Sequence, residues 1–430
     1  MALSSLRPLR SKNFALVWSS AMVSNIGTWM QTVALGTLIT LNTHSVLWNA
    51  LVIGAAFIPM GLLSPLGGVL ADRLDRRRWL IVTTIAEAVV AAGLTLFVAV
   101  GIDPPFLILI FAFLGGVAGA IGFPSYQSML PDLVERDDLL AAVSLSSAQW
   151  NMGRVVGPAL AAIVLFLWTP AVAFGINAVS FGAVVVALLF VKLPHRARAK
   201  DGESVIGRLR DGAQIAFREP GCRSAIILIT IVALVGSPFI GLVASFAIDG
   251  LHRHADGTAI LTTAQGVGAV LGALALAPLA KEFGQKIVVS IALFAFCLAI
   301  VLYGLSPSIY LAALAMVLVG GTYICVLSGL NSVVQFRAPE AARGRVLSIF
   351  MMALGTIYPI GLILEGAIGQ SVGIKGITII SGVTLAIILG GVALFDRKIF
   401  TSLFVQNTDR VIDASTPEVG EIDLAQDLQD

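Results

Sequence analysis

The sequence predicts an all-α membrane protein with twelve transmembrane helices in two pseudo-symmetric six-helix halves, with both termini in the cytoplasm. Three observations lead to this fold class: the composition, the number of long apolar segments, and the distribution of positive charge between the loops. Of the 430 residues, 57% are hydrophobic and 12% are charged, and the net charge is +2. Soluble domains carry about 25% charged residues, so most of this surface must face lipid.

Twelve segments are long and apolar enough to cross a bilayer core, which takes about 20 helical residues. The first apolar run follows a basic N-terminus, but it is too long for the core of a signal peptide and is therefore assigned as a span. Spans 5 and 8 come closest to failing this hydropathy criterion, because they contain many small and polar residues. The predicted spans are 14–41, 46–71, 79–101, 105–130, 139–168, 170–193, 223–249, 258–280, 286–305, 308–336, 344–371 and 374–396.

Positive charge is segregated to one side of the membrane in this assignment. Of the 27 Lys and Arg residues, all except Arg154, Arg253 and Lys375 fall in the N-terminal segment, the loops that join even to odd spans, or the C-terminal segment. Lys and Arg accumulate in cytoplasmic loops. One miscounted span would scramble this pattern, so the charges support twelve spans and cytoplasmic termini.

Landmarks in the two halves of the chain repeat in one register. Pro131 after span 4 corresponds to Pro339 after span 10, and Gly153 in span 5 corresponds to Gly361 in span 11 at the same offset. A basic connection near the middle of the chain separates the two blocks of six spans. We therefore divide the chain into an N-terminal half (1–193), a cytoplasmic linker (194–222), a C-terminal half (223–396) and a cytoplasmic tail (397–430). The acidic end of this tail is expected to be disordered.

Two motifs give the chain a family resemblance. The stretch from Gly68 to Arg78 resembles the signature loop between helices 2 and 3 of the major facilitator superfamily, G-x-L-x-D-R-x-G-R-[RK], with Asp75 in place of the usual glycine. The stretch from Gly153 to Ala161 resembles the antiporter motif G-x-x-x-G-P-x-x-G-G, with alanines for the final glycines. Residues 24–31 in span 1, 154–158 in span 5 and 177–181 in span 6 further resemble the enterobactin-exporter-like branch, also called transmembrane secretion effectors. This resemblance implies the major facilitator fold, and a substrate site between the halves that opens to each side in turn.

The loop after span 2 is expected to act as a gate by this resemblance. Its site residues are Gly68, Asp72, Arg73, Arg76 and Arg77. The arginines also anchor the loop at the cytoplasmic face and bind anionic headgroups. The resemblance places Asp72 opposite the start of span 11. Its negative charge would interact favourably there with the positive end of the helix dipole and pair with Arg343 or Arg345.

The motif in span 5 consists of Gly153, Arg154, Gly157 and Pro158. Glycines four residues apart lie on one helix face, and they predict a close helix-packing seam. The resemblance adds that this seam seals the transporter against leak. The sequence does not separate the two roles.

Ionisable residues inside spans are the sharpest functional candidates, because each costs roughly 2.5–3.5 kcal/mol or more at the bilayer centre. Glu365 in span 11 is the first candidate for proton coupling, as a carrier of protons or of a cationic substrate, unless it is simply solvated near the far interface. Glu87 in span 3 is the second candidate, and a structural role is its alternative. Arg154 does not release its proton, so it is expected to bind an anionic substrate or a carboxylate partner. Polar residues on spans 1, 4, 5, 8 and 10 complete the pool of cavity candidates, from which some are expected only to bond helices together. This pool is Asn25, Gln31, Gln127, Gln149, Asn151, Arg154, Gln265, Asn331 and Gln335.

The resemblance implies a secondary transporter, and the antiporter-like span favours proton-coupled export of a small molecule such as a drug or siderophore. A proton symporter that imports a nutrient is the alternative on the same fold, and a non-transporting receptor is also open. A membrane-embedded enzyme is disfavoured, because no H-E-x-x-H or G-x-S-x-G motif occurs, and an ATP-driven pump lacks its phosphate-binding loop. His252 and His254 alone are weak evidence for a metal. We expect no cofactor, metal or nucleic-acid partner, and a monomer in the bacterial inner membrane.

Overall fold

The computed structural model describes residues 6–191, 205–339 and 342–403, and every regular element within these ranges is helical. The first group of long helices is α1 (Lys12–Thr43), α2 (Val46–Arg73), α3 (Arg76–Ala99), α4 (Pro105–Met129), α5 (Leu139–Leu167) and α6 (Pro170–Phe190). The second group is α8 (Pro220–Ile231), α9 (Phe239–Ser245), α10 (Ala255–Phe283), α11 (Gln285–Leu305), α12 (Ile309–Arg337), α13 (Arg343–Val372) and α14 (Ile374–Phe395). Two further helices lie outside these groups: α7 (Val205–Arg218) precedes α8, and α15 (Arg397–Ser402) follows α14.

Eleven helical stretches in the described ranges are long and apolar enough to cross a membrane. They include α5 and α10, which carry the small and polar residues of predicted spans 5 and 8. The helix α1 is not among the eleven, although its 32 residues make it the longest helix of the described chain. The predicted span 223–249 is not one α-helix: the π-helical segments η4 (Val232–Gly236) and η5 (Phe246–Gly250) lie on either side of α9. The protein is therefore an all-helical, multi-pass bundle.

Side-chain caps fix where several helices begin. The Asp75 carboxylate accepts a hydrogen bond of 2.8 Å from the backbone N–H of Arg78 and caps α3. Ser45 caps α2, and Glu219 caps α8 in the same way. Such caps satisfy N–H groups that the helix itself leaves unpaired. Asp75 therefore gives the signature loop a helix start where the superfamily pattern has glycine.

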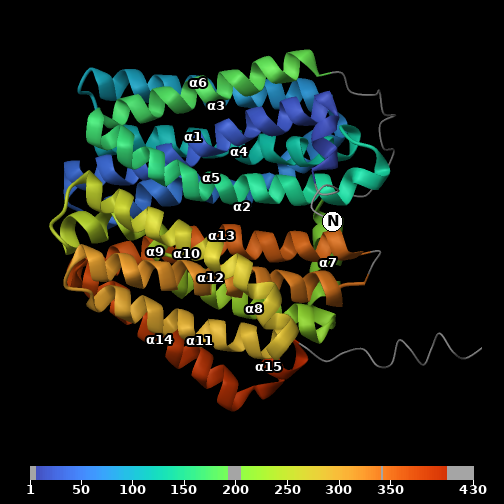
Figure 1. Ribbon diagram of the computed structural model, residues 1–430, viewed down its shortest axis with the longest axis vertical. Coiled ribbons are helices and arrows are strands. Elements are labelled where there is room, and N and C mark those ends of the chain that lie inside the picture. Colours follow the sequence, from blue (N-terminus) through green and yellow to red (C-terminus); the bar gives the residue numbers. More distant parts are fainter. Residues whose placement is uncertain (1–5, 192–204, 340–341, 404–430) are drawn as a thin grey trace, which may run out of the picture.

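The helices form two groups that lie side by side, α1–α6 and α8–α14 (Figure 1). Equivalent helix pairs pack tightly in both groups, because glycines bring the backbones together. A Cβ atom on Gly116 of α4 would overlap the Ala56 carbonyl of α2. A Cβ atom on Gly268 of α10 would likewise overlap the Val317 carbonyl of α12. Small residues at such crossings are typical of helices that pack in membranes.

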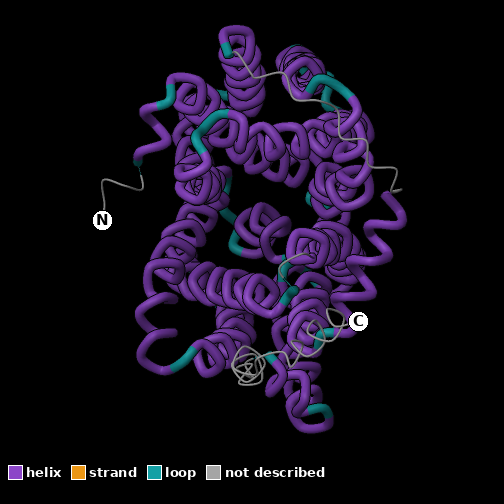
Figure 2. Tube along the Cα trace, turned by 90° about the vertical axis from the view of Figure 1, so that its right-hand side faces the viewer, coloured by secondary structure: helices purple, strands orange, loops and turns teal. Residues whose placement is uncertain are grey.

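The two groups are tied together at one end of the bundle. We call the end where α1 begins the terminal end, and the opposite end the distal end; Figure 2 views the bundle from the terminal end. At the distal end, the Asn49 side chain of α2 donates to the Gly241 carbonyl at 3.0 Å and to the Ser245 hydroxyl at 2.9 Å. His44 lies 3.0 Å from Asp249. These bonds all cross from the first group to the second.

The contact between α2 and α13 does not extend to the terminal end. Gly61, near the middle of α2, lies against Thr356 of α13. Gly68 lies seven residues later on the same face of α2, yet a Cβ atom there would meet no atom within 4 Å. The contact between α2 and α13 therefore runs from the distal end, where Gly366 meets Ala50, to mid-depth and does not continue to Gly68.

Candidate functional site: a cavity between the helix groups

A cavity of about 330 Å³ lies between the two helix groups, within the lower range of ligand sites. Helices α1, α2 and α5 line it from the first group, and α9, α10, α12 and α13 line it from the second. Most of the wall is aliphatic, aromatic or glycine surface. The polar or charged residues on the wall are Trp29, Thr32, Arg154, Thr258, Thr262, Gln265, Ser328 and Tyr358.

Arg154 is the one charged residue among the described residues that line the cavity. Its guanidinium carbon lies 5.2 Å from the ring centroid of Trp29 on α1, a cation–π contact. Trp29 in turn makes an edge-on contact with Trp150, with ring centroids 6.2 Å apart. No described residue forms an ion pair or a hydrogen bond with the Arg154 side chain.

The glycines of the span 5 motif set this arrangement. A Cβ atom on Gly153 would lie 3.1 Å from the Cβ of Asn25, and one on Gly157 would lie 2.6 Å from the Cβ of Trp29. Both glycines therefore face α1, and the two backbones lie in close contact. Arg154 follows Gly153 by one residue, about 100° around the helix, so its side chain leaves the seam and enters the cavity.

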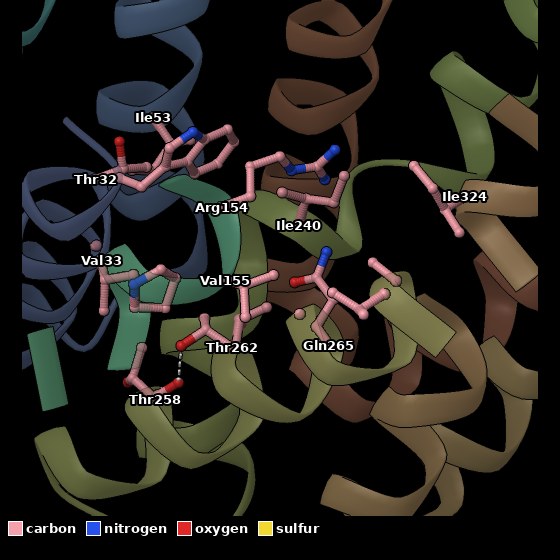
Figure 3. Close-up of a pocket in the computed structure, with 18 of the residues that line it drawn as sticks. Thr32, Val33, Ile53, Arg154, Val155, Ile240, Thr258, Thr262, Gln265 and Ile324 are labelled. Atoms are coloured by element: carbon pink, nitrogen blue, oxygen red, sulfur yellow. Dashed lines mark hydrogen bonds between the residues drawn. The ribbon is translucent and has the colours of Figure 1, made fainter. Parts of the chain in front are cut away.

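One face of α10 supplies further polar groups. Thr258, Thr262 and Gln265 are spaced at i, i+4 and i+7, which places them in one row toward the cavity. The Thr262 hydroxyl donates to the Thr258 carbonyl at 2.8 Å. Figure 3 shows the side chains of Arg154 and Gln265 reaching into the same space from α5 and α10. Tyr358 of α13 joins them; its hydroxyl is buried and has no hydrogen-bond partner among the described residues.

The arrangement of two helix groups around a central cavity agrees with the comparisons to known proteins. Residues 3–412 match the family model described as transmembrane secretion effector. The chain belongs to this family. It is a transporter of the major facilitator superfamily, as the signature loop and the span 5 motif predicted.

Similar proteins support the same assignment. This secretion effector is 22% identical to macrolide efflux protein A of Streptococcus pyogenes over 86% of this chain and 92% of the relative. It is 25% identical to the staphyloferrin A transporter of Staphylococcus aureus over 91% of this chain and 98% of the relative. A bacterial Spinster homologue in an inward-facing, unoccupied conformation has a TM-score of 0.70 at 15% identity, over 92% of this chain and 97% of the homologue. The D-xylose–proton symporter has a TM-score of 0.69 at 15% identity, over 89% and 97%, and shares the fold.

Of the polar candidates from the sequence, Arg154 and Gln265 line this cavity. Several others bond helices together. Gln31 accepts a hydrogen bond of 2.9 Å from Asn177 of α6, and Gln149 accepts one of 2.9 Å from the hydroxyl of Tyr126.

Four of the five remaining candidates do not line the cavity either. The amide of Gln335 donates to Asn331 at 2.7 Å, one turn earlier on α12. Asn25 packs against Gly153, and Gln127 is exposed. The side chain of Asn151 lies outside the described residues.

The two carboxylates proposed for coupling occupy different places. Glu365 lies on α13 with 8% of its surface exposed, and its Oε1 has no hydrogen-bond partner among the described residues. It is seven residues after Tyr358 on the same helix face, so it lies two turns closer to the distal end than Tyr358 does. Glu87 packs on the other side of the first group, where its Oε1 would meet a Cβ on Gly119 of α4.

The signature loop lies at the terminal end. Arg76 donates to the Ser128 carbonyl at 3.0 Å and to Asp132 at 3.3 Å, which ties the loop to the end of α4. Arg77 donates to two carbonyls in the last turn of α6, and Arg73 is exposed.

Only part of the predicted latch between the signature loop and the start of α13 lies within the described residues. The side chain of Asp72 lies outside the described residues. Of its two predicted partners, Arg345 lies 3.8 Å from Asp211 of α7.

Sequence reasoning missed several cavity residues. Trp29 belonged to a family phrase in span 1, and Tyr358 was not singled out. The row formed by Thr258, Thr262 and Gln265 carried a usable signal, because polar residues at i, i+4 and i+7 on an otherwise apolar helix predict a polar face.

Proposed function

We propose that this transporter is a proton-coupled antiporter that exports a small amphipathic molecule across the bacterial inner membrane by alternating access. The main support for this proposal is the cavity between the two helix groups. The contacts of Asn49 and His44 with the second group close the bundle at the distal end. Relatives named for macrolide and multidrug efflux support the outward direction.

The topology that fits this proposal has twelve spans and both termini in the cytoplasm. In this assignment α1 is the first span, and α8 to η5 together form the seventh. The arginines of the signature loop then lie at the cytoplasmic face, as the distribution of Lys and Arg favours. The terminal end becomes the inner side, so the cavity faces the cytoplasm in this conformation and takes up substrate from there.

The moving parts in this proposal are the two halves, 1–193 and 223–396, joined by the linker 194–222. The tail 397–430 stays cytoplasmic, and one chain suffices for transport. When the halves rock, the terminal end closes and Asp72 approaches the start of α13. The latch between Asp72 and Arg343 or Arg345 belongs to that second state.

Glu365 is the proton carrier in this proposal. It is buried, and its Oε1 has no hydrogen-bond partner among the described residues. A proton bound there would neutralise a charge that is costly in the bilayer interior. Tyr358 lines the cavity two turns before Glu365 on the same face of α13. Glu87 lies away from the cavity and takes the weaker role of a structural carboxylate.

The test uses inverted membrane vesicles with an acidic interior. We expect uptake of at least one probe from a panel that contains a macrolide, a cationic dye and an aromatic carboxylate, and we expect a proton ionophore to stop it. Glu365→Gln should remove the dependence on the proton gradient, whereas Glu282→Gln, an exposed carboxylate at the end of α10, should not. Gradient-driven uptake into right-side-out vesicles instead would show a symporter, and full proton-dependent export by Glu365→Gln would refute the carrier assignment.

A further inference from the structure

We propose that the cavity binds the carboxylate group of an amphipathic organic anion, with Arg154 as its charged contact. The proposal names the substrate class of the exporter proposed above and, for transport, rests on that function. Arg154 is the one charge on the described cavity wall, and no described residue forms an ion pair with it.

The Arg154 guanidinium is a cation inside a membrane protein without an ion-pair partner among the described residues, so a bound anion would stabilise it. A charge in the bilayer interior is costly and is retained where it pairs or serves a substrate path. The contact with Trp29 stabilises the guanidinium through the ring face but accepts none of its five N–H donors as a carboxylate would. Arginine is more weakly hydrated than lysine and presents a planar fork that fits a carboxylate with two parallel bonds. The cavity thus offers a fixed anion receptor.

Two neutral donors extend this receptor. The Tyr358 hydroxyl is buried, with 8% of the residue exposed, and has no partner among the described residues. The Gln265 amide also forms no hydrogen bond within the described ranges, and Figure 3 shows it reaching toward the space beside Arg154. Tyr358 and Arg154 line the same cavity, from α13 and α5. A carboxylate bound at Arg154 would satisfy groups that are otherwise unpaired.

The rest of the wall determines the other part of the ligand. Val33, Ile53, Phe57, Val155 and Ile240 form an apolar surface around the polar groups. Burial of an apolar body there contributes about 25 cal/mol per Å². A cationic ligand would meet Arg154 without a compensating carboxylate on the described wall, and a neutral one would leave the guanidinium unpaired. The anion with an apolar body is the class that satisfies both surfaces.

The experiment compares three probes that share one ring system: 1-naphthoate, 1-naphthamide and 1-naphthylmethylammonium. Binding to the purified full-length protein in nanodiscs is measured by isothermal titration calorimetry, without any transport step. We expect naphthoate to bind about ten- to a hundredfold more tightly than the amide, the range of a charge-assisted hydrogen bond. The ammonium compound should bind most weakly.

Three variants test the assignment to Arg154. Arg154→Gln should reduce naphthoate affinity to that of the amide while amide affinity is unchanged, which also shows that the cavity is intact. Arg154→Lys should retain part of the preference, because it keeps the charge but not the fork. Lys398→Gln removes one positive charge from an exposed position on α15 and should leave all three affinities unchanged. Equal affinities in the wild type, or an anion preference that survives Arg154→Gln, would overturn the proposal.

The outcomes separate this proposal from the exporter function. Naphthoate binding that depends on Arg154, without gradient-driven uptake in inverted vesicles, would leave the anion site standing and refute export of this class. Gradient-driven export of the macrolide or the cationic dye, with no Arg154-dependent anion binding, would leave the exporter standing and refute the anion site.

Discussion

Gly157→Ala tests whether the seam between α1 and α5 sets the cavity geometry. The new methyl group would lie 2.6 Å from the Cβ of Trp29 and 2.8 Å from the Ile26 carbonyl. Ordinary contact begins at about 3.4 Å, so α1 and α5 must separate by about 0.8 Å. A gap of that size forfeits a quarter to a half of the dispersion energy along the seam. Overpacking of this kind costs about 1–3 kcal/mol.

The matched control is Gly182→Ala on α6, where a Cβ atom would meet nothing within 4 Å. Both substitutions gain the same helix propensity of about 1 kcal/mol, so the difference between them isolates the clash. Thermal unfolding of the purified proteins should show Gly157→Ala less stable than the control by that 1–3 kcal/mol. Proteoliposomes with Gly157→Ala should also leak protons faster, since the seam no longer closes. Equal stability and equal leak in the two variants would refute the packing argument.

Two further substitutions probe the ends of the bundle. Arg77→Ala removes two hydrogen bonds to the last carbonyls of α6 and should lower the free energy of unfolding by about 1–2 kcal/mol, whereas Arg78→Ala, an exposed neighbour, should not; equal unfolding curves would contradict this. Asp249→Asn weakens the pair with His44 that joins the groups at the distal end, and should increase labelling of a cysteine at buried position Thr40 by an impermeant maleimide added on the side of the distal end. Unchanged labelling would show that this pair does not hold the distal end closed.

The fold was predictable because hydropathy and charge act along the whole chain. Twelve apolar segments and the loop arginines predicted a multi-pass helical bundle, and the span 5 glycines predicted a tight seam that the structure places between α1 and α5. The interruption of the seventh predicted span was not predicted. The π-helical segments around α9 keep the backbone helical, so they leave no change in hydropathy or length for the sequence to reveal.

The cavity wall was predictable only in part, because apolar helices do not reveal which face points inward. Arg154 was found because a charge inside a span is costly, and Gln265 because it is polar on span 8. Gln31 and Gln149 look the same in sequence, yet their amides bond to Asn177 and Tyr126 within the first group. Whether such a side chain lines the cavity or bonds to a neighbouring helix depends on the rotation of its helix. That rotation is set by close contacts such as those of Gly153 rather than by residue type.

The position of Trp29 has a practical consequence. Of the six tryptophans, it is the one on the described cavity wall, where its ring holds the Arg154 cation and contacts Trp150. Indole emission depends on the charge and polarity around the ring, so a ligand that draws the guanidinium away, or a rocking motion that separates the two rings, will change the fluorescence. Trp29→Phe provides the blank for that signal. The protein thus contains an intrinsic optical reporter for occupancy of its own cavity.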